Sequence, residues 1–271
     1  MRGSVRARRG EVGKERTTPI ASEPSLSLVI PAYNEAGRIG ATIAAVQSFL
    51  ADQPYASELI VVDDGSTDQT ARQAREALRD RDHARLIALP HRGKAAALRA
   101  GMECAHHDQI AFCDADLATP LSDLNTLRAR LAQGCQVAIG SREGVGASRL
   151  GEPTYRHVMG RVFNMLVRVL LLPGIHDTQC GFKLFDRDAA LAILARARLY
   201  ANPDIAISGP RVTAFDVELL VIARRLGYKI CVVPVVWTYG SQSKVHPARD
   251  TWHNVRDVLT VRINAWRGYY Q

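Results

Sequence analysis

The chain has 271 residues, of which 47% are hydrophobic and 23% are charged, and such a composition is typical of a globular protein with a sizeable core. The net charge of +8 is concentrated at the ends: residues 1–16 carry six basic and two acidic side chains, and residues 244–271 carry five basic and two acidic ones. Basic ends suit attraction to an anionic membrane surface or to nucleic acid, and they also occur as simple solubilising tails.

No segment is expected to be a signal peptide or a transmembrane helix. The basic N-terminal residues are not followed by an apolar stretch. The best candidate for a span, residues 162–172, is 11 residues long and includes Asn164 and Arg168, whereas a spanning helix needs about 20 apolar residues. We therefore expect a soluble or peripheral protein.

The cysteines are odd in number, widely spaced and mostly set in apolar segments, and no CxxC motif occurs. This pattern predicts reduced, buried thiols in a cytoplasmic protein and argues against a structural zinc site. The five positions are 104, 113, 135, 180 and 231.

Short apolar runs alternate with segments of helical periodicity in the first half of the chain. Residues 1–23 are polar and without periodicity, so we expect a disordered basic arm there. The alternation and the short connections indicate an α/β fold, a mainly parallel sheet with helices on both faces. The expected strands are 26–30, 58–62, 85–89, 109–113 and 136–140, and the expected helices are 36–50, one after residue 67, 94–105 and 121–131.

After residue 150 the pattern changes to longer helices and short strands. We expect one domain over residues 24–245, whose second half adds helices and a short β pair, and a basic C-terminal helix within 246–271 packed on or near it. The helices are expected at 155–172, 215–226 and 251–266, and the strands at 182–185, 229–233 and 235–239.

Unusual polar residues directly follow four of the expected strands. In a parallel sheet the carboxyl ends of the strands meet at one edge, and ligands bind there. The residues therefore predict a ligand site at that edge. The four groups are Tyr33-Asn34-Glu35, Asp63-Asp64, Asp114-Ala115-Asp116 and Ser141-Arg142.

Asp114 and Asp116 are the strongest candidates for a metal site. Two carboxylates one residue apart can share Mg²⁺ or Mn²⁺, directly or through water, and the ion then binds phosphate oxygens with its remaining positions. Such an ion would neutralise a departing diphosphate. We expect Asp116 to coordinate the ion directly. The alternative is a solvated loop or a helix cap.

The other strand ends carry groups suited to a nucleotide. Asp63 and Asp64 follow a buried strand, where ribose hydroxyls, a base N–H or a cation would compensate their charge. Tyr33 offers a flat face to a nucleobase, and Glu35 can accept a hydrogen bond from a ribose. The alternative is that these residues only form turns and cap the following helices.

Basic residues suited to phosphate lie nearby in the sequence. Lys94 follows Gly93 at the start of an expected helix, whose N–H groups favour anions. Arg142 stands at a strand end, and a guanidinium binds phosphate in a bidentate manner. Neither GxxxxGK[ST] nor GxGxxG occurs, which excludes a Walker loop and disfavours a dinucleotide cofactor.

Taken in order, the motifs Pro-Ala-Tyr-Asn-Glu, Asp-Asp-Gly-Ser-Thr-Asp, Arg-Gly-Lys and Asp-Ala-Asp resemble the inverting family-2 glycosyltransferases of GT-A (Rossmann-like) fold. The segments 177–185 and 215–220 are similar to the branch that glucosylates dolichyl or polyprenyl phosphate. The resemblance covers residues 26–245. It implies transfer of a sugar, with glucose from UDP-glucose as the best candidate, onto a polyprenyl or dolichyl phosphate.

The resemblance also implies roles for individual residues. The donor nucleotide sugar would be bound by Pro31, Ala32, Tyr33, Glu35, Asp63, Asp64, Lys94, Asp114, Ala115, Asp116, Ser243 and Lys244. The acceptor phosphate would meet Arg142, Arg156 and Gln179, and the metal would be held by Asp114 and Asp116. Some relatives have a metal-binding Gln where this chain has Ala118, so His246 is a candidate third ligand.

An anionic phosphate nucleophile needs no strong base, so catalysis would rest on positioning and charge neutralisation, with Asp116 acting through the metal and Arg142 acting on phosphate. Asp216 and Glu218 would orient the acceptor, or act as base for an alcohol, or be only helix N-terminal charges.

Arginines and apolar residues in 155–172 suit either a membrane interface or core packing. With the basic ends, they favour peripheral attachment on the cytoplasmic face of a membrane.

Three other functions stay open at this point. One is a soluble transferase with a hydroxyl acceptor, and another is a non-catalytic nucleotide-sugar-binding protein. The third, nucleic-acid binding, is disfavoured because no stacking aromatic side chains accompany the basic ends.

Overall fold

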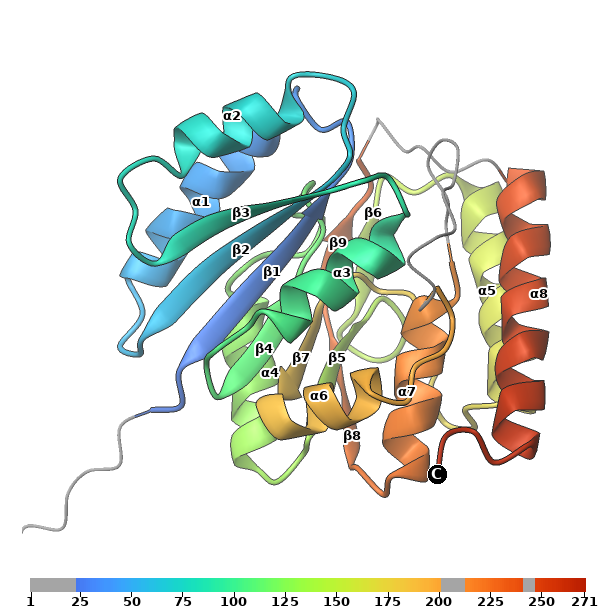
Figure 1. Cartoon of the computed structure of the whole chain (residues 1–271). Helices are drawn as coiled ribbons and strands as arrows, with labels where there is room; N and C mark the ends of the chain where they lie inside the picture. The colour runs from blue at the N-terminus through green and yellow to red at the C-terminus, as the bar shows by residue number, and fades with distance from the viewer. Residues whose placement is uncertain (1–22, 201–212, 241–246) are drawn as a thin grey trace, which may run out of the picture.

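The computed structural model describes residues 23–200, 213–240 and 247–271, and within α8 it describes the side chains from residue 253 onward. Its centre is a seven-stranded sheet of order β3-β2-β1-β4-β7-β5-β8, in which only β7 runs antiparallel to its neighbours (Figure 1). The strands are β1 (Leu26–Ala32), β2 (Ser57–Asp64), β3 (Ala84–Leu89), β4 (Gln109–Phe112), β5 (Val137–Ser141), β7 (Lys183–Asp186) and β8 (Ile230–Pro234). The predicted mainly parallel α/β sheet is confirmed.

Helices cover both faces of this sheet, because the central strands bury both of their sides. On β1, Leu28 and Ile30 face one hydrophobic cluster and Val29 faces the other. One cluster includes α1 (Ile39–Ala51), α2 (Thr70–Ala77) and α4 (Asp123–Ala132), and the other includes α3 (Lys94–Glu103), α6 (Arg187–Leu194) and α7 (Phe215–Arg225).

Two longer helices pack beside α7, outside the sheet. α5 (Thr154–Leu170) and α8 (Pro247–Trp266) contact each other and lie side by side at one end of the molecule (Figure 1). The buried side chains of α8 and of the segment after it, among them Val258, Val261 and Tyr270, belong to the same core cluster as α7. No helix in the described part of the chain is long and apolar enough to cross a membrane.

The second half of the chain contains two elements beyond those expected from the sequence. The helix α6 directly follows β7, and the short strand β6 (Ser148–Leu150) precedes α5. β6 pairs in parallel with β9 (Val236–Thr238). Each residue of β6 pairs with the residue 88 positions later in the chain, as Ser148 does with Val236. β8, in contrast, is part of the main sheet.

The cysteines differ from the expectation of reduced thiols. Cys135 and Cys231 form a disulfide with a Cα–Cα distance of 6.1 Å. Cys135 lies two residues before β5 and Cys231 lies in β8, and these strands are neighbours in the sheet, which brings together two thiols 96 positions apart. Cys104 is exposed, so the expectation of burial is wrong for it as well, whereas Cys113 and Cys180 are buried free thiols as expected.

Candidate active site

The sheet brings the predicted polar residues to one edge. β1, β2, β4 and β5 are parallel and end there, and antiparallel β7 begins there, so the segment around Asp177 joins them. A cavity of about 520 Å³ opens at this edge between α1 and the chain around Asp116 and Gly240. The tertiary fold thus supplies a pocket beside the Asp-Ala-Asp motif.

Asp64 organises the turn between β3 and α3. It is 2% exposed and accepts hydrogen bonds from the backbone N–H groups of Arg92 (2.8 Å) and Gly93 (2.7 Å). Nδ1 of His91 lies 2.8 Å from the same carboxylate, and the His91 ring stacks on Tyr33 at 3.9 Å between centroids. Asp64 therefore holds His91 in place, and with it the stacked Tyr33–His91 pair.

Asp63 is buried next to this pair with an unused acceptor. Its Oδ2 accepts the N–H of Ser66 at 3.3 Å, while its buried Oδ1 has no hydrogen-bond partner among the described residues. An unsatisfied buried carboxylate oxygen is costly unless a ligand donates to it. Gly65 keeps the turn open, because at φ +66° a Cβ there would lie 2.5 Å from the His91 backbone nitrogen. This geometry suits the N–H of a base or the O–H of a ribose.

The loop after β1 is fastened to the loop after β2. The backbone N–H of Asn34, at φ 52°, donates to Oγ of Ser66 at 2.9 Å. The N–H of Glu35 donates to Oγ1 of Thr70 at 2.6 Å, and the Glu35 carboxylate pairs with Arg38 at 3.0 Å. The Pro-Ala-Tyr-Asn-Glu segment is thus held in place beside Asp63 and Asp64.

The Asp-Ala-Asp segment is fixed by its backbone. The carbonyl of Ala115 accepts a hydrogen bond from Oγ1 of Thr42 at 2.6 Å, and Oδ1 of Asp116 accepts from the N–H of Ala118 at 3.1 Å. Burial and the neighbouring Asp114 carboxylate together raise the pKa of Asp116. Two acidic groups held this closely are the donor set that a hard divalent cation prefers.

Lys94 is a cation beside the Asp-Ala-Asp segment. Its Nζ donates to Oδ1 of Asp114. Burial alone would lower the pKa of Lys94, but Asp114 and Asp216 raise it above its usual value, so the ammonium stays charged. Gly181 packs against the same carboxylate, and a Cβ there would lie only 2.0 Å from Oδ2 of Asp114.

Arg142, which the sequence placed at a strand end, has a partner that the sequence did not suggest. Its Nε and Nη2 donate to the two oxygens of Asp177 at 2.7 and 2.8 Å, and its backbone N–H donates at 2.9 Å. Asp177 is fully buried. Burial alone would raise the pKa of Asp177, but Arg142 holds it well below its usual value. The guanidinium is therefore held rigidly, 5.3 Å from the centre of the Trp237 ring.

The other predicted acceptor residues lie on the same side. Nη1 of Arg156, in the first turn of α5, donates to the hydroxyl of Tyr239 at 3.0 Å. The N–H of Gln179 donates to Asp177 at 3.3 Å. Arg142, Arg156 and Gln179 are thus each tied to the loops around β7 and β9.

Asp216 and Glu218 occupy two different surroundings. Asp216 accepts from Nζ of the fully buried Lys183 at 2.6 Å, so its charge is already compensated. Glu218 is 0% exposed and accepts from the N–H of Leu199 and, at 2.7 Å, from the hydroxyl of Tyr270. Its contacts are those of a structural anchor, and burial raises its pKa. We therefore assign Glu218 no role in the chemistry proposed below.

Lys183, Asp177 and His91 are residues of the candidate site that the sequence patterns did not single out. Lys183 and Asp177 lie in the 177–185 segment on which the family resemblance partly rests. The signal for Lys183 was its position in an expected apolar strand, since a lysine is seldom fully buried without a partner. Ser243, Lys244 and His246 lie outside the described residues.

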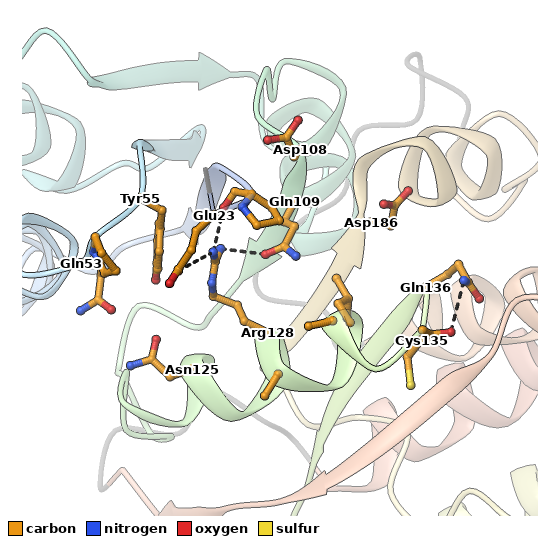
Figure 2. Close-up of a pocket in the computed structure, with 16 residues that line it drawn as sticks. Glu23, Gln53, Tyr55, Asp108, Gln109, Asn125, Arg128, Cys135, Gln136 and Asp186 are labelled. Carbon is orange, nitrogen blue, oxygen red and sulfur yellow. Dashed lines mark hydrogen bonds and ion pairs between the residues drawn. The ribbon is translucent and has the colours of Figure 1, made fainter. Parts of the chain in front are cut away.

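A further cavity, of about 850 Å³, lies at the opposite edge of the sheet (Figure 2). Arg128 fills its centre, stacked on Tyr55 at 3.5 Å and hydrogen-bonded to Gln109 at 2.7 Å. It contains none of the residues predicted for the site. We therefore take the Asp114 edge as the candidate active site.

No group of three or more His, Cys, Asp or Glu side chains able to hold a metal is found within residues 23–200, 213–240 and 247–271. Asp114 and Asp116 nevertheless fit a cation, because they are two hard oxygen donors whose mutual repulsion a positive ion would relieve. Water and phosphate oxygens can complete such a shell.

Comparisons with known proteins agree with this geometry. The model of the family described as glycosyl transferase family 2 matches residues 27–194. The chain is 34% identical to the Homo sapiens protein named dolichyl-phosphate beta-glucosyltransferase, covering 94% of this chain and 82% of that protein. It is 32% identical to the Saccharomyces cerevisiae protein of the same name, covering 91% and 76%.

Two solved structures have the same fold. Glucosyl-3-phosphoglycerate synthase of M. tuberculosis aligns with a TM-score of 0.61 at 23% identity, over 90% of this chain and 81% of that one. Mannosyl-3-phosphoglycerate synthase of Rubrobacter xylanophilus aligns with a TM-score of 0.64 at 19% identity, over 90% and 75%.

The sheet topology, shared with these two structures, is that of the GT-A fold. Within that class, the chain belongs to glycosyl transferase family 2. The resemblance drawn from the sequence motifs is confirmed.

Proposed function

We propose that this glycosyltransferase moves glucose from UDP-glucose onto a polyprenyl or dolichyl phosphate, with inversion at the anomeric carbon. The observation that carries the proposal is the pairing of two charged sites at one edge. The Asp63, Asp114 and Asp116 carboxylates suit a nucleotide diphosphate with its cation, and the Arg142 guanidinium held by Asp177 suits a phosphate acceptor. The names of the human and yeast relatives support this acceptor class.

On the donor side, Asp63 would accept a hydrogen bond from the nucleoside through its buried Oδ1. The Tyr33–His91 stack would provide an aromatic surface near the base. Lys94 would approach the diphosphate. Asp114 and Asp116 would hold Mg²⁺ or Mn²⁺, and the bound ion would supply positive charge to the departing diphosphate. A related fold has been solved with Mn²⁺ and UDP, which supports this choice.

On the acceptor side, Asp177 uses two of the five N–H donors of Arg142, and the others would orient the acceptor phosphate. A phosphate oxygen then attacks the anomeric carbon as the bond to the UDP oxygen breaks, so no side chain has to remove a proton. Positioning and charge neutralisation account for the catalysis. Asp216, paired with Lys183, would keep the Lys94 ammonium charged rather than act as a base.

Because the proposed acceptor is a lipid, we also propose that the protein works at a membrane surface, on its cytoplasmic face. Ser243, Lys244 and His246 remain candidates for closing over the donor or completing the metal shell, and they lie outside the described residues.

The test is a donor and acceptor screen with Mg²⁺ or Mn²⁺ present. Release of UDP or GDP is measured from a panel of nucleotide sugars, with polyprenyl phosphate, with 3-phosphoglycerate and without acceptor. UDP release from UDP-glucose that depends on polyprenyl phosphate supports the proposal. Dependence on 3-phosphoglycerate would instead identify a soluble transferase, and binding without turnover would identify a sensor.

The variant Asp116→Asn keeps the shape of the side chain and removes its charge. It should abolish turnover, since the cation would lose its expected direct ligand. Unchanged turnover in Asp116→Asn would refute the metal assignment while leaving the acceptor specificity to be judged from the screen.

A further inference from the structure

The outer face of the α5–α8 pair is an exposed apolar surface. On α5, the exposed side chains Tyr155, Val158, Val162, Met165 and Val169 recur every three or four residues and so form one stripe along the helix. Val162 and Val169 are 65% and 72% exposed. An apolar stripe of this kind normally packs against a protein core. In α5, however, the side that packs against the core is formed by other residues, Phe163, Asn164 and Val167.

The described part of α8 continues this surface. Leu259, Ile263 and Trp266 are exposed at spacings of four and three, and Trp266 is 82% exposed. The two helices contact each other and stand together at one end of the molecule (Figure 1). Because the helices are neighbours, we treat the two stripes together as one apolar surface, which we call the α5–α8 face. Exposed apolar surfaces of this kind mark sites of interaction.

The exposed charged side chains in the described parts of the two helices are all basic, and one of them, Arg161, pairs with Glu143 of the loop after β5 at 3.6 Å. α5 contains no Asp or Glu and carries three arginines, of which Arg161 is exposed. In residues 253–266 of α8, Arg256 and Arg262 are exposed, whereas the one acidic residue, Asp257, is buried and accepts a hydrogen bond from Tyr200 at 2.6 Å. We therefore expect the binding partner of this face to offer an apolar region for the exposed apolar side chains and negative charge for the arginines.

We infer that the α5–α8 face docks onto a bilayer that contains anionic lipids. Apolar and aromatic side chains flanked by arginines are what an interfacial helix requires, and anionic headgroups complement the arginines. A second copy of the chain fits less well. A symmetric dimer through this face would bring two sets of arginines together without acidic partners.

The same helix connects this face to the acceptor side of the active site. On its inner side, Oδ1 of Asn164 accepts from the N–H and the hydroxyl of Thr178, both at 3.1 Å, next to Asp177. At its start, Arg156 contacts Tyr239. Docking would thus place Arg142 near the headgroup region. This use of the surface rests on the proposed function, whereas binding to the bilayer does not.

Sedimentation with vesicles tests the inference. The wild-type protein is mixed with vesicles of phosphatidylcholine alone or with phosphatidylglycerol added, at low and high salt. We expect binding to the anionic vesicles that weakens with salt. The double variant Val162→Glu/Val169→Glu should reduce the partition coefficient by about tenfold or more, because it puts two charges into the buried part of the interface. Both side chains are exposed, so the fold should be retained, and circular dichroism checks this.

The matched control is Val145→Glu, at a fully exposed valine in the loop between β5 and β6. It adds a charge of the same sign outside the two helices and should leave vesicle binding close to that of the wild type. Equal losses in the control and the double variant, or wild-type binding in the double variant, would overturn the assignment. So would a dimer that the double variant dissociates without any vesicle binding.

Activity on a short, water-soluble prenyl phosphate separates this inference from the proposed function. The double variant should retain wild-type turnover on that acceptor and lose turnover on acceptor embedded in vesicles. If the wild-type protein binds vesicles but glucosylates neither acceptor, the membrane surface stands and the proposed reaction fails.

Discussion

Replacing Asp177 by Asn should destabilise the protein through Arg142. The carboxylate is fully buried and accepts three hydrogen bonds from Arg142, at 2.7, 2.8 and 2.9 Å. The amide side chain of the Asp177→Asn variant would keep one acceptor oxygen but no charge, so the guanidinium would lose its counter-ion in a buried place. Breaking a buried pair from one side costs about 3–5 kcal/mol. Because one acceptor survives, we expect a loss at the lower end of that range, about 3 kcal/mol in the free energy of unfolding.

The assay is urea and thermal unfolding followed by circular dichroism. A loss of ~3 kcal/mol should lower the Tm by about 6–12 °C in a domain of this size. The control is Glu76→Gln, which breaks the exposed pair of Arg72 and Glu76 and should change stability by less than about 0.5 kcal/mol. A loss below about 1 kcal/mol in Asp177→Asn would show that the pair does not hold the acceptor side together.

The same pair predicts a dependence of stability on pH. The folded state holds the pKa of Asp177 below its usual value of 3.8, so the unfolded chain takes up the proton first as the pH falls. The stability that Asp177 contributes is thus complete above about pH 4 and is lost progressively below it. Unfolding free energies measured between about pH 3 and pH 7 should show a steeper acid loss in the wild type than in Asp177→Asn. Parallel curves would contradict this linkage.

Two further substitutions test the site from other directions. Gly181→Ala should abolish UDP release, because the added Cβ would lie 2.0 Å from Oδ2 of Asp114. The control Gly160→Ala should behave as wild type, because no atom lies within 4 Å of the Cβ that it adds. Normal turnover in Gly181→Ala would show that the position of Asp114 is not critical. Glu218→Gln should keep turnover near the wild-type level, since Glu218 anchors Tyr270 and two backbone N–H groups. A fall of about 10²–10⁴-fold with the fold intact would instead indicate a general base.

The donor side of the site was largely readable from the sequence. Strands such as residues 26–30 and 58–62 are buried on both faces, so they are apolar except for Ser27 and Glu58, and the polar residues that follow them are conspicuous. Parallel strands then place Asp63 and Asp114 at the same edge without further information.

The acceptor side was only partly readable. Arg142 was identified from its place at a strand end, but its partner Asp177 lies 35 positions away and reaches it because β7 inserts between β4 and β5 in the antiparallel direction. Nothing in the local pattern of β7 distinguishes the two directions. The short helix α6 was missed because eight residues give too few turns for a clear period.

Local sequence patterns do not reveal contacts between residues that are distant in the chain. Glu218 has the position of an ordinary helix N-terminal charge, and only the packing of the chain end brings Tyr270 to it, 52 positions later. The disulfide between Cys135 and Cys231 likewise depends on β5 and β8 being neighbours.

The sequence by itself therefore determined the class of fold and the edge of the sheet at which the candidate acidic donor residues gather, because these follow from local apolar runs and from what interrupts them. The tertiary structure alone decided which charge each residue faces. It joined Arg142 to Asp177 and Asp216 to Lys183, and it turned the valines of α5 outward beside the exposed apolar side chains of α8, since such pairings depend on contacts between segments that are far apart in the chain.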